Sequence, residues 1–113
     1  MGAKPAKAHD SIFKPGTKGD YDPDHMAATT SHSELLGWVR SLLAAKDDRV
    51  PSPHGGRVPL FDEWHRRTIE SIAKQVFAHE AQGRAVLATG RQIVVVKHCV
   101  NRLTAAVTSV LAV

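Results

Sequence analysis

The stretch PLFDEWHRRTIESIAKQVFAHEAQG, residues 59–83, decides the fold. Its apolar side chains recur in steps of three and four residues, which is the spacing of one face of an α-helix. Pro59 suits a first helical turn, and Gly83 suits the position after a helix end. The pattern predicts a helix of about 24 residues, longer than average. Its apolar face comprises Leu60, Phe61, Trp64, Ile69, Ile72, Ala73, Val76 and Phe77.

A medium-length helix is predicted before this stretch. Ser31 with Glu34 three residues later forms a capping box, in which each side chain bonds the other residue's backbone amide. Apolar residues then follow at helical spacing up to about residue 46: Leu35, Leu36, Val39, Leu42 and Leu43. Prolines and the Gly55-Gly56 pair predict a loop over residues 47–58.

Residues 85–110 admit two interpretations. Thr89 and Gln92 form a second capping box, and a helix starting there would carry an apolar seam at alternating three- and four-residue steps. The seam comprises Ile93, Val96, Val100, Leu103, Val107 and Val110. Asn101 could divide this helix in two, because asparagine is a good cap. The alternative is a β-hairpin that pairs 85–88 with 93–99, favoured by the valine-rich run.

Residues 1–30 differ from the rest of the chain. They show no apolar periodicity, and their four lysines cancel their four aspartates. We expect an extended or disordered N-terminal arm over 1–30, followed by one helical domain over 31–113. The excess positive charge of the chain, +4 overall, then lies in that domain and is mostly arginine.

The composition bears on the cellular compartment in which we expect the protein. Cys99 is the single cysteine, so no intrachain disulfide can form, which fits a nuclear or other reducing intracellular compartment. The start of the chain lacks the apolar run of a secretory signal, and no apolar stretch is long enough to span a membrane. We therefore expect no membrane partner.

Two short motifs resemble those of a known protein family. Ile69-Glu70-Ser71-Ile72-Ala73 is similar to the stretch of an aromatic or aliphatic residue followed by Glu-x-Ile-Ala in the middle of the long helix of the histone fold. Thr89-Gly90-Arg91-Gln92-Ile93 is similar to the Thr-x-Arg-Glu-Ile start of that family's third helix, at a matching separation. Over about residues 33–112 the chain resembles the core histone whose fold is followed by an extra C-terminal helix. The resemblance implies an all-α, histone-fold-like domain: medium helix, loop, long helix, short link, helix and C-terminal helix.

The resemblance also implies a function. A histone-fold subunit pairs with another such chain, as a homodimer or heterodimer, and binds double-stranded DNA through loop arginines, as in chromatin. The DNA-binding candidates are Arg49, Arg57, Arg84 and Arg91. The partner-interface candidates are Trp38, Leu42, Trp64, Ile69, Ile72, Val76, Val96 and Val100.

A second interpretation has the same helical fold but no DNA binding. The neutral arm and modest charge suit a helical assembly or adaptor protein within a larger complex, with the seam from Ile93 to Val110 as a coiled-coil-like contact. Neither interpretation includes an enzyme. No residues assemble into a catalytic constellation, the seven histidines lack metal-ligand spacing, and a small cysteine on an apolar helix is typically buried. We expect no cofactor, no metal and no small-molecule substrate.

Overall fold

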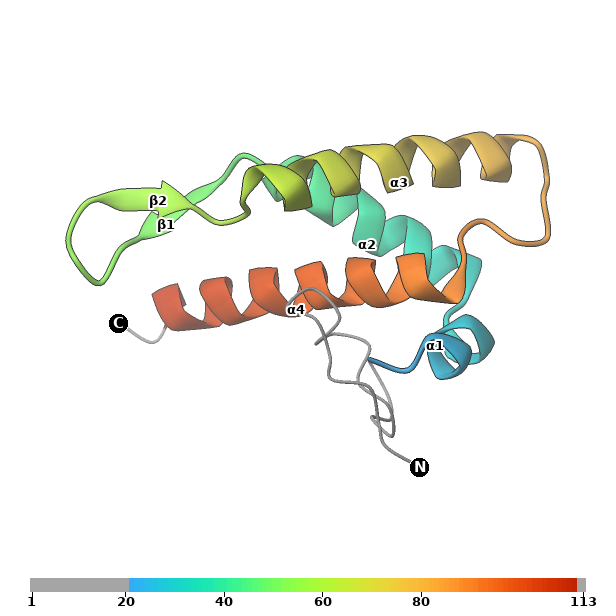
Figure 1. The fold of residues 1–113 in the computed structure, drawn as a ribbon, viewed down its shortest axis with the longest axis horizontal. Coiled ribbons are helices and arrows are strands. Elements are labelled where there is room, and N and C mark those ends of the chain that lie inside the picture. Colours follow the sequence, from blue (N-terminus) through green and yellow to red (C-terminus); the bar gives the residue numbers. More distant parts are fainter. Residues whose placement is uncertain (1–20, 112–113) are drawn as a thin grey trace, which may run out of the picture.

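The computed structural model describes residues 21–111 and is mostly helical, with helix over 68% of those residues. The elements follow the chain in the order α1 (Pro23–Thr29), α2 (His32–Ala45), β1 (Arg49–Pro51), β2 (Arg57–Pro59), α3 (Glu63–Ala81) and α4 (Gly90–Leu111) (Figure 1). The all-α class is confirmed, apart from one small two-stranded sheet.

The α1 helix lies within the segment that was expected to be an unstructured arm, so that expectation is wrong for residues 23–29. Asp22 caps the helix by accepting a hydrogen bond from the Asp24 amide at 3.1 Å, and Pro23 occupies its first turn. Met26 is buried, which anchors α1 on the rest of the molecule. A single buried side chain gives no apolar period, and for this reason the sequence pattern missed the helix. The remaining arm, residues 1–20, lies outside the described residues.

The α2 helix begins where the sequence predicted. Ser31 Oγ accepts a hydrogen bond from the Glu34 amide at 3.1 Å, and Glu34 Oε1 accepts one from the Ser31 amide at 3.2 Å. The apolar face of α2 then points inward, with Leu35, Val39 and Leu42 buried. The predicted capping box is therefore confirmed.

The predicted loop at 47–58 contains a small hairpin instead. Strands β1 and β2 pair antiparallel with Val50 opposite Val58, and the turn uses Gly55 and Gly56 at φ of 92° and 69°. Each strand has an arginine that donates across the pair, Arg49 to the Arg57 carbonyl at 2.8 Å and Arg57 to the Arg49 carbonyl at 2.7 Å. These reciprocal bonds hold the two strands together. Each strand has only three residues, too few to give a recognisable alternating pattern in the sequence.

The α3 helix is shorter than expected, with 19 residues, because it begins after Asp62 and not at Pro59. Pro59 ends β2, and Asp62 caps the helix by accepting the His65 amide hydrogen bond at 2.7 Å. The predicted stop is confirmed, since Gly83 follows the helix at a φ of 67°, which favours glycine.

The α4 helix decides the ambiguous region. It runs unbroken over 22 residues, so the hairpin interpretation of 85–99 is wrong, and no break occurs at Asn101. The expected third and C-terminal helices are one element. The second capping box is confirmed: the Thr89 amide donates to Gln92 Oε1 at 2.9 Å, and the Gln92 amide donates to Thr89 Oγ1 at 3.2 Å.

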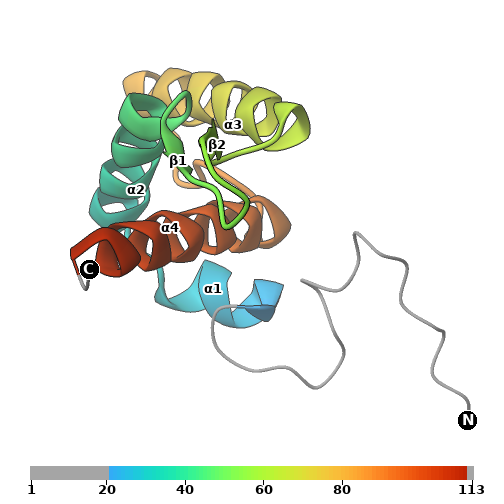
Figure 2. The same ribbon diagram turned by 90° about the vertical axis from the view of Figure 1, so that its left-hand side faces the viewer.

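The helices α3 and α4 lie side by side, and α2 crosses behind both of them (Figure 1). The α1 helix packs on the other side of α4 (Figure 2). The hairpin lies beyond the N-terminal end of α3 (Figure 1). The core forms where α2 meets α3 and α4. It includes Leu35, Val39, Leu42, Phe61, Ile69, Ile72, Val76, Val94, Val96 and Cys99, and no polar or charged residue among the described ones is buried.

The close approach of α1 to α4 gives a first prediction. A Cβ atom at Gly90 would overlap the Pro23 carbonyl, whereas one at Gly37, inside α2, would meet nothing within 4 Å. Gly90→Ala should lower the free energy of unfolding by about 1–3 kcal/mol, because backbone must shift to make room. Gly37→Ala should raise it by about 0.5–1 kcal/mol, because alanine favours helix. Urea unfolding measures both, and equal effects of the two variants would contradict the packing of α1.

Candidate binding groove between α3 and α4

A groove runs between α3 and α4, because these helices make few direct contacts and α2 carries most of the packing behind them. Its volume is about 470 Å³. Helix α3 contributes Trp64, Arg67, Thr68, Ser71 and Ile72, and α4 contributes Arg91, Gln92 and Val95. We refer to this set as the α3–α4 groove.

The groove has an apolar surface, and one large aromatic side chain on it is exposed to solvent. Ile72 and Val95 are buried side chains of the core, and they line its inner surface. Trp64, by contrast, is 56% exposed, and its indole lies nearly perpendicular to the His65 ring, with centroids 5.1 Å apart. A tryptophan this exposed beside a recess is typical of a surface that another molecule covers.

Two arginines, one from each helix, also line the groove. Arg67 is exposed and pairs with Glu63 one helical turn earlier, at 2.7 Å. Arg91 is exposed in the first turn of α4, where backbone amide groups already favour negative charge. Thr68 and Ser71 of α3 add hydroxyl groups to the lining. The groove therefore offers an apolar surface, hydroxyl groups and two guanidinium groups.

A reciprocal amide contact ties the two helices together near one end of the groove. Gln75 Nε2 donates to Gln92 Oε1 at 2.8 Å, and Gln92 Nε2 donates to Gln75 Oε1 at 3.0 Å. Gln75 also donates to the Leu87 carbonyl at 3.2 Å. Because Gln92 simultaneously caps α4, the start of that helix is held at a fixed distance from α3.

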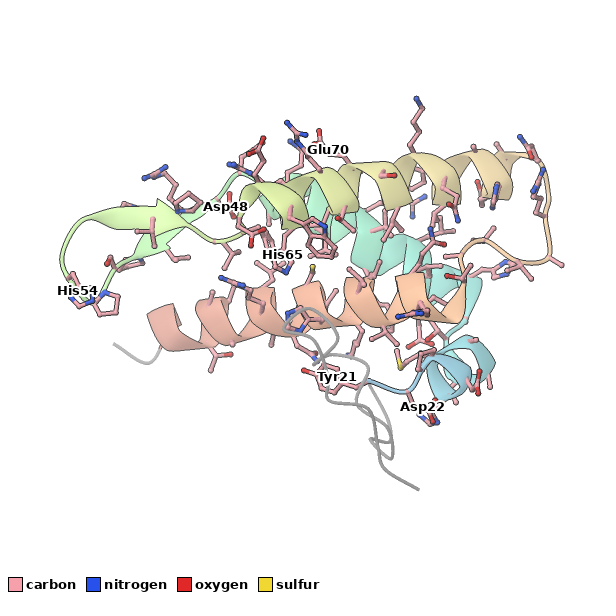
Figure 3. The ribbon with its side chains drawn as sticks, viewed as in Figure 1. Tyr21, Asp22, Asp48, His54, His65 and Glu70 are labelled. Atoms are coloured by element: carbon pink, nitrogen blue, oxygen red, sulfur yellow. The ribbon has the colours of Figure 1, made fainter. Side chains whose placement is uncertain are left out.

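A histidine pair joins the helices nearer the start of α3. His65 stacks on His98 of α4 with ring centroids 5.9 Å apart, and Tyr21 approaches His98 at 6.3 Å. Figure 3 shows His65 between α3 and α4, with Tyr21 on the far side of α4. Asp62 accepts a hydrogen bond from His65 Nδ1 at 2.7 Å, which orients that ring. Nδ1 of His98 is buried and has no hydrogen-bond partner among the described residues.

This environment shifts three pKa values. Burial lowers the pKa of His98 below 6.5, and the neighbouring His65 and Arg102 lower it further. The hydrogen bond from the His65 backbone amide lowers the pKa of Asp62 below 3.8, aided by the His65 side chain. Cys99 is a fully buried core residue, as its apolar surroundings predicted, and this burial raises the pKa of its thiol to about 12.

The structure brings together three of the residues singled out from sequence. Trp64 and Ile72, predicted for a partner interface, and Arg91, predicted for DNA, all line the α3–α4 groove. Trp38 and Val100 are half-buried against the core, with the Lys97 ammonium 4.9 Å from the Trp38 ring. The other predicted interface residues are buried within the chain's own core: Leu42, Ile69, Val76 and Val96.

The other predicted DNA-binding arginines lie apart from the groove. Arg49 and Arg57 are exposed on the hairpin, and Arg84 is exposed in the loop after α3, where it donates to Gln82 at 2.8 Å. These two places are at opposite ends of α3, whose 19 residues span about 28 Å. In a single chain the four arginines therefore form no common patch.

The sequence interpretation missed several residues of the groove. Thr68 and Ser71 follow Trp64 at helical steps of four and seven, so a search for small polar residues along the apolar stripe would have found them. Arg67 and the Gln75–Gln92 contact had no such signal, because they depend on how α3 packs beside α4.

Comparisons with known proteins give no match: no protein-family model, no curated protein and no solved structure is significantly similar to the chain. None of the helices in residues 21–111 combines the length and the apolar character needed to cross a membrane.

The histidine pair gives a second prediction. Since the pKa of His98 is lower in the folded protein than in the unfolded chain, the unfolded chain takes up a proton first as the pH drops. The free energy of unfolding should therefore fall as the pH decreases from 6.5 through the folded pKa. Asp62 adds a further loss at more acidic pH, below 3.8.

Denaturant unfolding at several pH values between about 7.5 and 5 measures this effect. His98→Phe should flatten the pH dependence, because it removes the half-buried titrating ring. His54→Gln, in the exposed hairpin turn, is the matched control and should retain the slope of the natural protein. An unchanged slope in His98→Phe would show that the dependence arises elsewhere.

Proposed function

We propose that this chain is a non-catalytic binding protein of the adaptor type, and that its α3–α4 groove receives an acidic amphipathic segment of a partner protein. The observation that carries the proposal is the exposure of Trp64 at the mouth of a groove that Arg67 and Arg91 also line. A groove between two helices is a common receptor for an amphipathic helix. Its volume of about 470 Å³ falls in the range of specific binding sites.

The lining chemistry defines the partner segment. Aliphatic side chains of the segment would pack over Ile72 and Val95 on the inner surface and remove the exposed apolar surface of Trp64 from water. Carboxylates at the edge of the segment would bind Arg67 and Arg91, since guanidinium groups match carboxylates in a two-pronged geometry. Glu63, which neutralises Arg67 in the free chain, would be displaced or would share that arginine.

A titration with designed peptides tests this proposal. Trp38→Phe leaves Trp64 as the single indole, so its fluorescence reports on the groove alone. A helical Leu/Glu peptide should cause a saturable change, whereas the same peptide with Lys for Glu should not. Arg91→Gln should weaken binding about tenfold, which corresponds to about 1.4 kcal/mol.

The matched control is Lys74→Gln, which removes one exposed positive charge from α3 outside the groove. It should leave the affinity for the acidic peptide unchanged. Equal binding of the acidic and basic peptides, or equal losses in the two variants, would contradict an acidic partner in this groove.

A second candidate function is the histone-like one, and the exposed arginines at both ends of α3 favour it. If two chains pack with their α3 helices antiparallel, the hairpin of one lies near the α3–α4 loop of the other. Arg49 and Arg57 would then join Arg84 and Arg91 of the second chain on one face, where duplex DNA binds through its phosphates. A nuclear location would follow from this candidate and not from the first.

Electrophoretic mobility with duplex DNA at low and moderate salt tests the second candidate. Binding should weaken steeply with salt, and Arg84→Gln should reduce both the affinity and the salt dependence, because one phosphate contact is lost. Lys74→Gln again serves as the control. Absence of any complex at low salt would eliminate this candidate and leave the protein-binding one.

A further inference from the structure

The second half of α4 carries an unusual surface. From Leu103 to Val113 the sequence holds no charged residue. Yet Thr104, Ala105 and Thr108 are exposed, and Val107 is 50% exposed. A helix surface that is uncharged all round is typical of a covered helix, not of one in water.

A second recess adjoins this part of α4. It is lined by Asp48, Arg49, Val50, Leu60, Leu103, Ala106 and Val107 and has a volume of about 210 Å³. It shares no residue with the α3–α4 groove. Figure 2 looks onto this end of the molecule, where the hairpin lies beside α4. We refer to this set as the hairpin–α4 recess.

We propose that a second copy of this chain packs against the hairpin–α4 recess through its own α4. The surface combines a recess with a half-exposed aliphatic side chain, Val107, at its lining. A two-fold dimer uses one patch twice, so it needs both features on each copy. Val107 of each chain then enters the recess of the other.

The charges at the recess also favour a second copy. Asp48 and Arg49 are neighbours at its rim, so the rim has no net charge and would not select an acidic or a basic partner. Across a two-fold axis, Asp48 of one copy can face Arg49 of the other, and the pair occurs twice. Leu103, Ala106 and Val107 carry no charge that would repel their own copies.

The recess is large enough for this occupant. An apolar cavity of about 150 Å³ holds a benzene-sized molecule, so a recess of 210 Å³ accepts a valine side chain with some of its neighbours. The small residue Ala106 allows the two helices to approach closely at this point. The inference does not depend on the proposed function, because it concerns a different surface.

Sedimentation equilibrium of the full chain tests the proposal. The natural protein should show a reversible monomer–dimer equilibrium with a dissociation constant below about 100 µM. Val107→Asp should shift it to monomer, because each dimer would bury two carboxylates in apolar recesses. Ala105→Asp is the matched control, since this exposed residue lies on the opposite side of α4, and it should remain dimeric.

A charge exchange tests the two-fold arrangement without altering α4. Asp48→Arg makes the rim wholly positive. Arg49→Asp makes it wholly negative and also removes the hydrogen bond from Arg49 to the Arg57 carbonyl. Each variant alone should dimerise more weakly. Mixing the two in equal amounts should restore dimers that contain one copy of each. A natural protein that stays monomeric, a Val107→Asp variant that stays dimeric, or a mixture that fails to associate would overturn the proposal.

Discussion

The structure depends on the burial of one face of α2 against two helices at once. Leu35, Val39 and Leu42 are buried where α2 crosses behind α3 and α4. Because α2 contacts each of these helices far more extensively than they contact each other, α3 and α4 need no broad contact between them. The same packing that forms the core therefore leaves the α3–α4 groove open.

Contacts between polar side chains then set the distance between α3 and α4, which their packing on α2 does not determine. The Gln75–Gln92 contact holds the start of α4 near the end of α3, and the His65–His98 stack joins them nearer the start of α3. Both contacts are partly shielded from water, so their geometry is better defined than that of the exposed Glu63–Arg67 pair. The two sides of the groove are therefore joined at two positions.

The sequence predicted those elements that local chemistry defines by itself. The capping boxes at Ser31 and Thr89 located the starts of α2 and α4, and Gly83 located the end of α3. Helix α1 was missed because its one anchor, Met26, gains its burial from α4, which is distant in the sequence. The start of α3 was misplaced because Pro59 and Asp62 both suit a first turn, and only the pairing of β2 excludes the proline.

The candidate site was harder to predict from the sequence than the helices were. Trp64 and Arg91 were singled out, but for different surfaces, and nothing in the sequence placed them in one groove. Their meeting depends on α3 and α4 running side by side, which follows from α2 and not from either helix. The apolar stripe of α3 also could not distinguish residues that face the chain's own core, such as Val76, from a residue that remains exposed, such as Trp64.

The continuity of α4 has a mechanical consequence. One unbroken helix carries Val95 in the groove and Val107 at the recess, twelve residues and about 18 Å apart. Two chains joined near Val107 would therefore present their grooves at a set separation, without a flexible linker between them. Such an arrangement favours a partner with two acidic segments at matching spacing, because binding of the first raises the effective concentration of the second. Avidity would then be determined by the stiffness of a single helix.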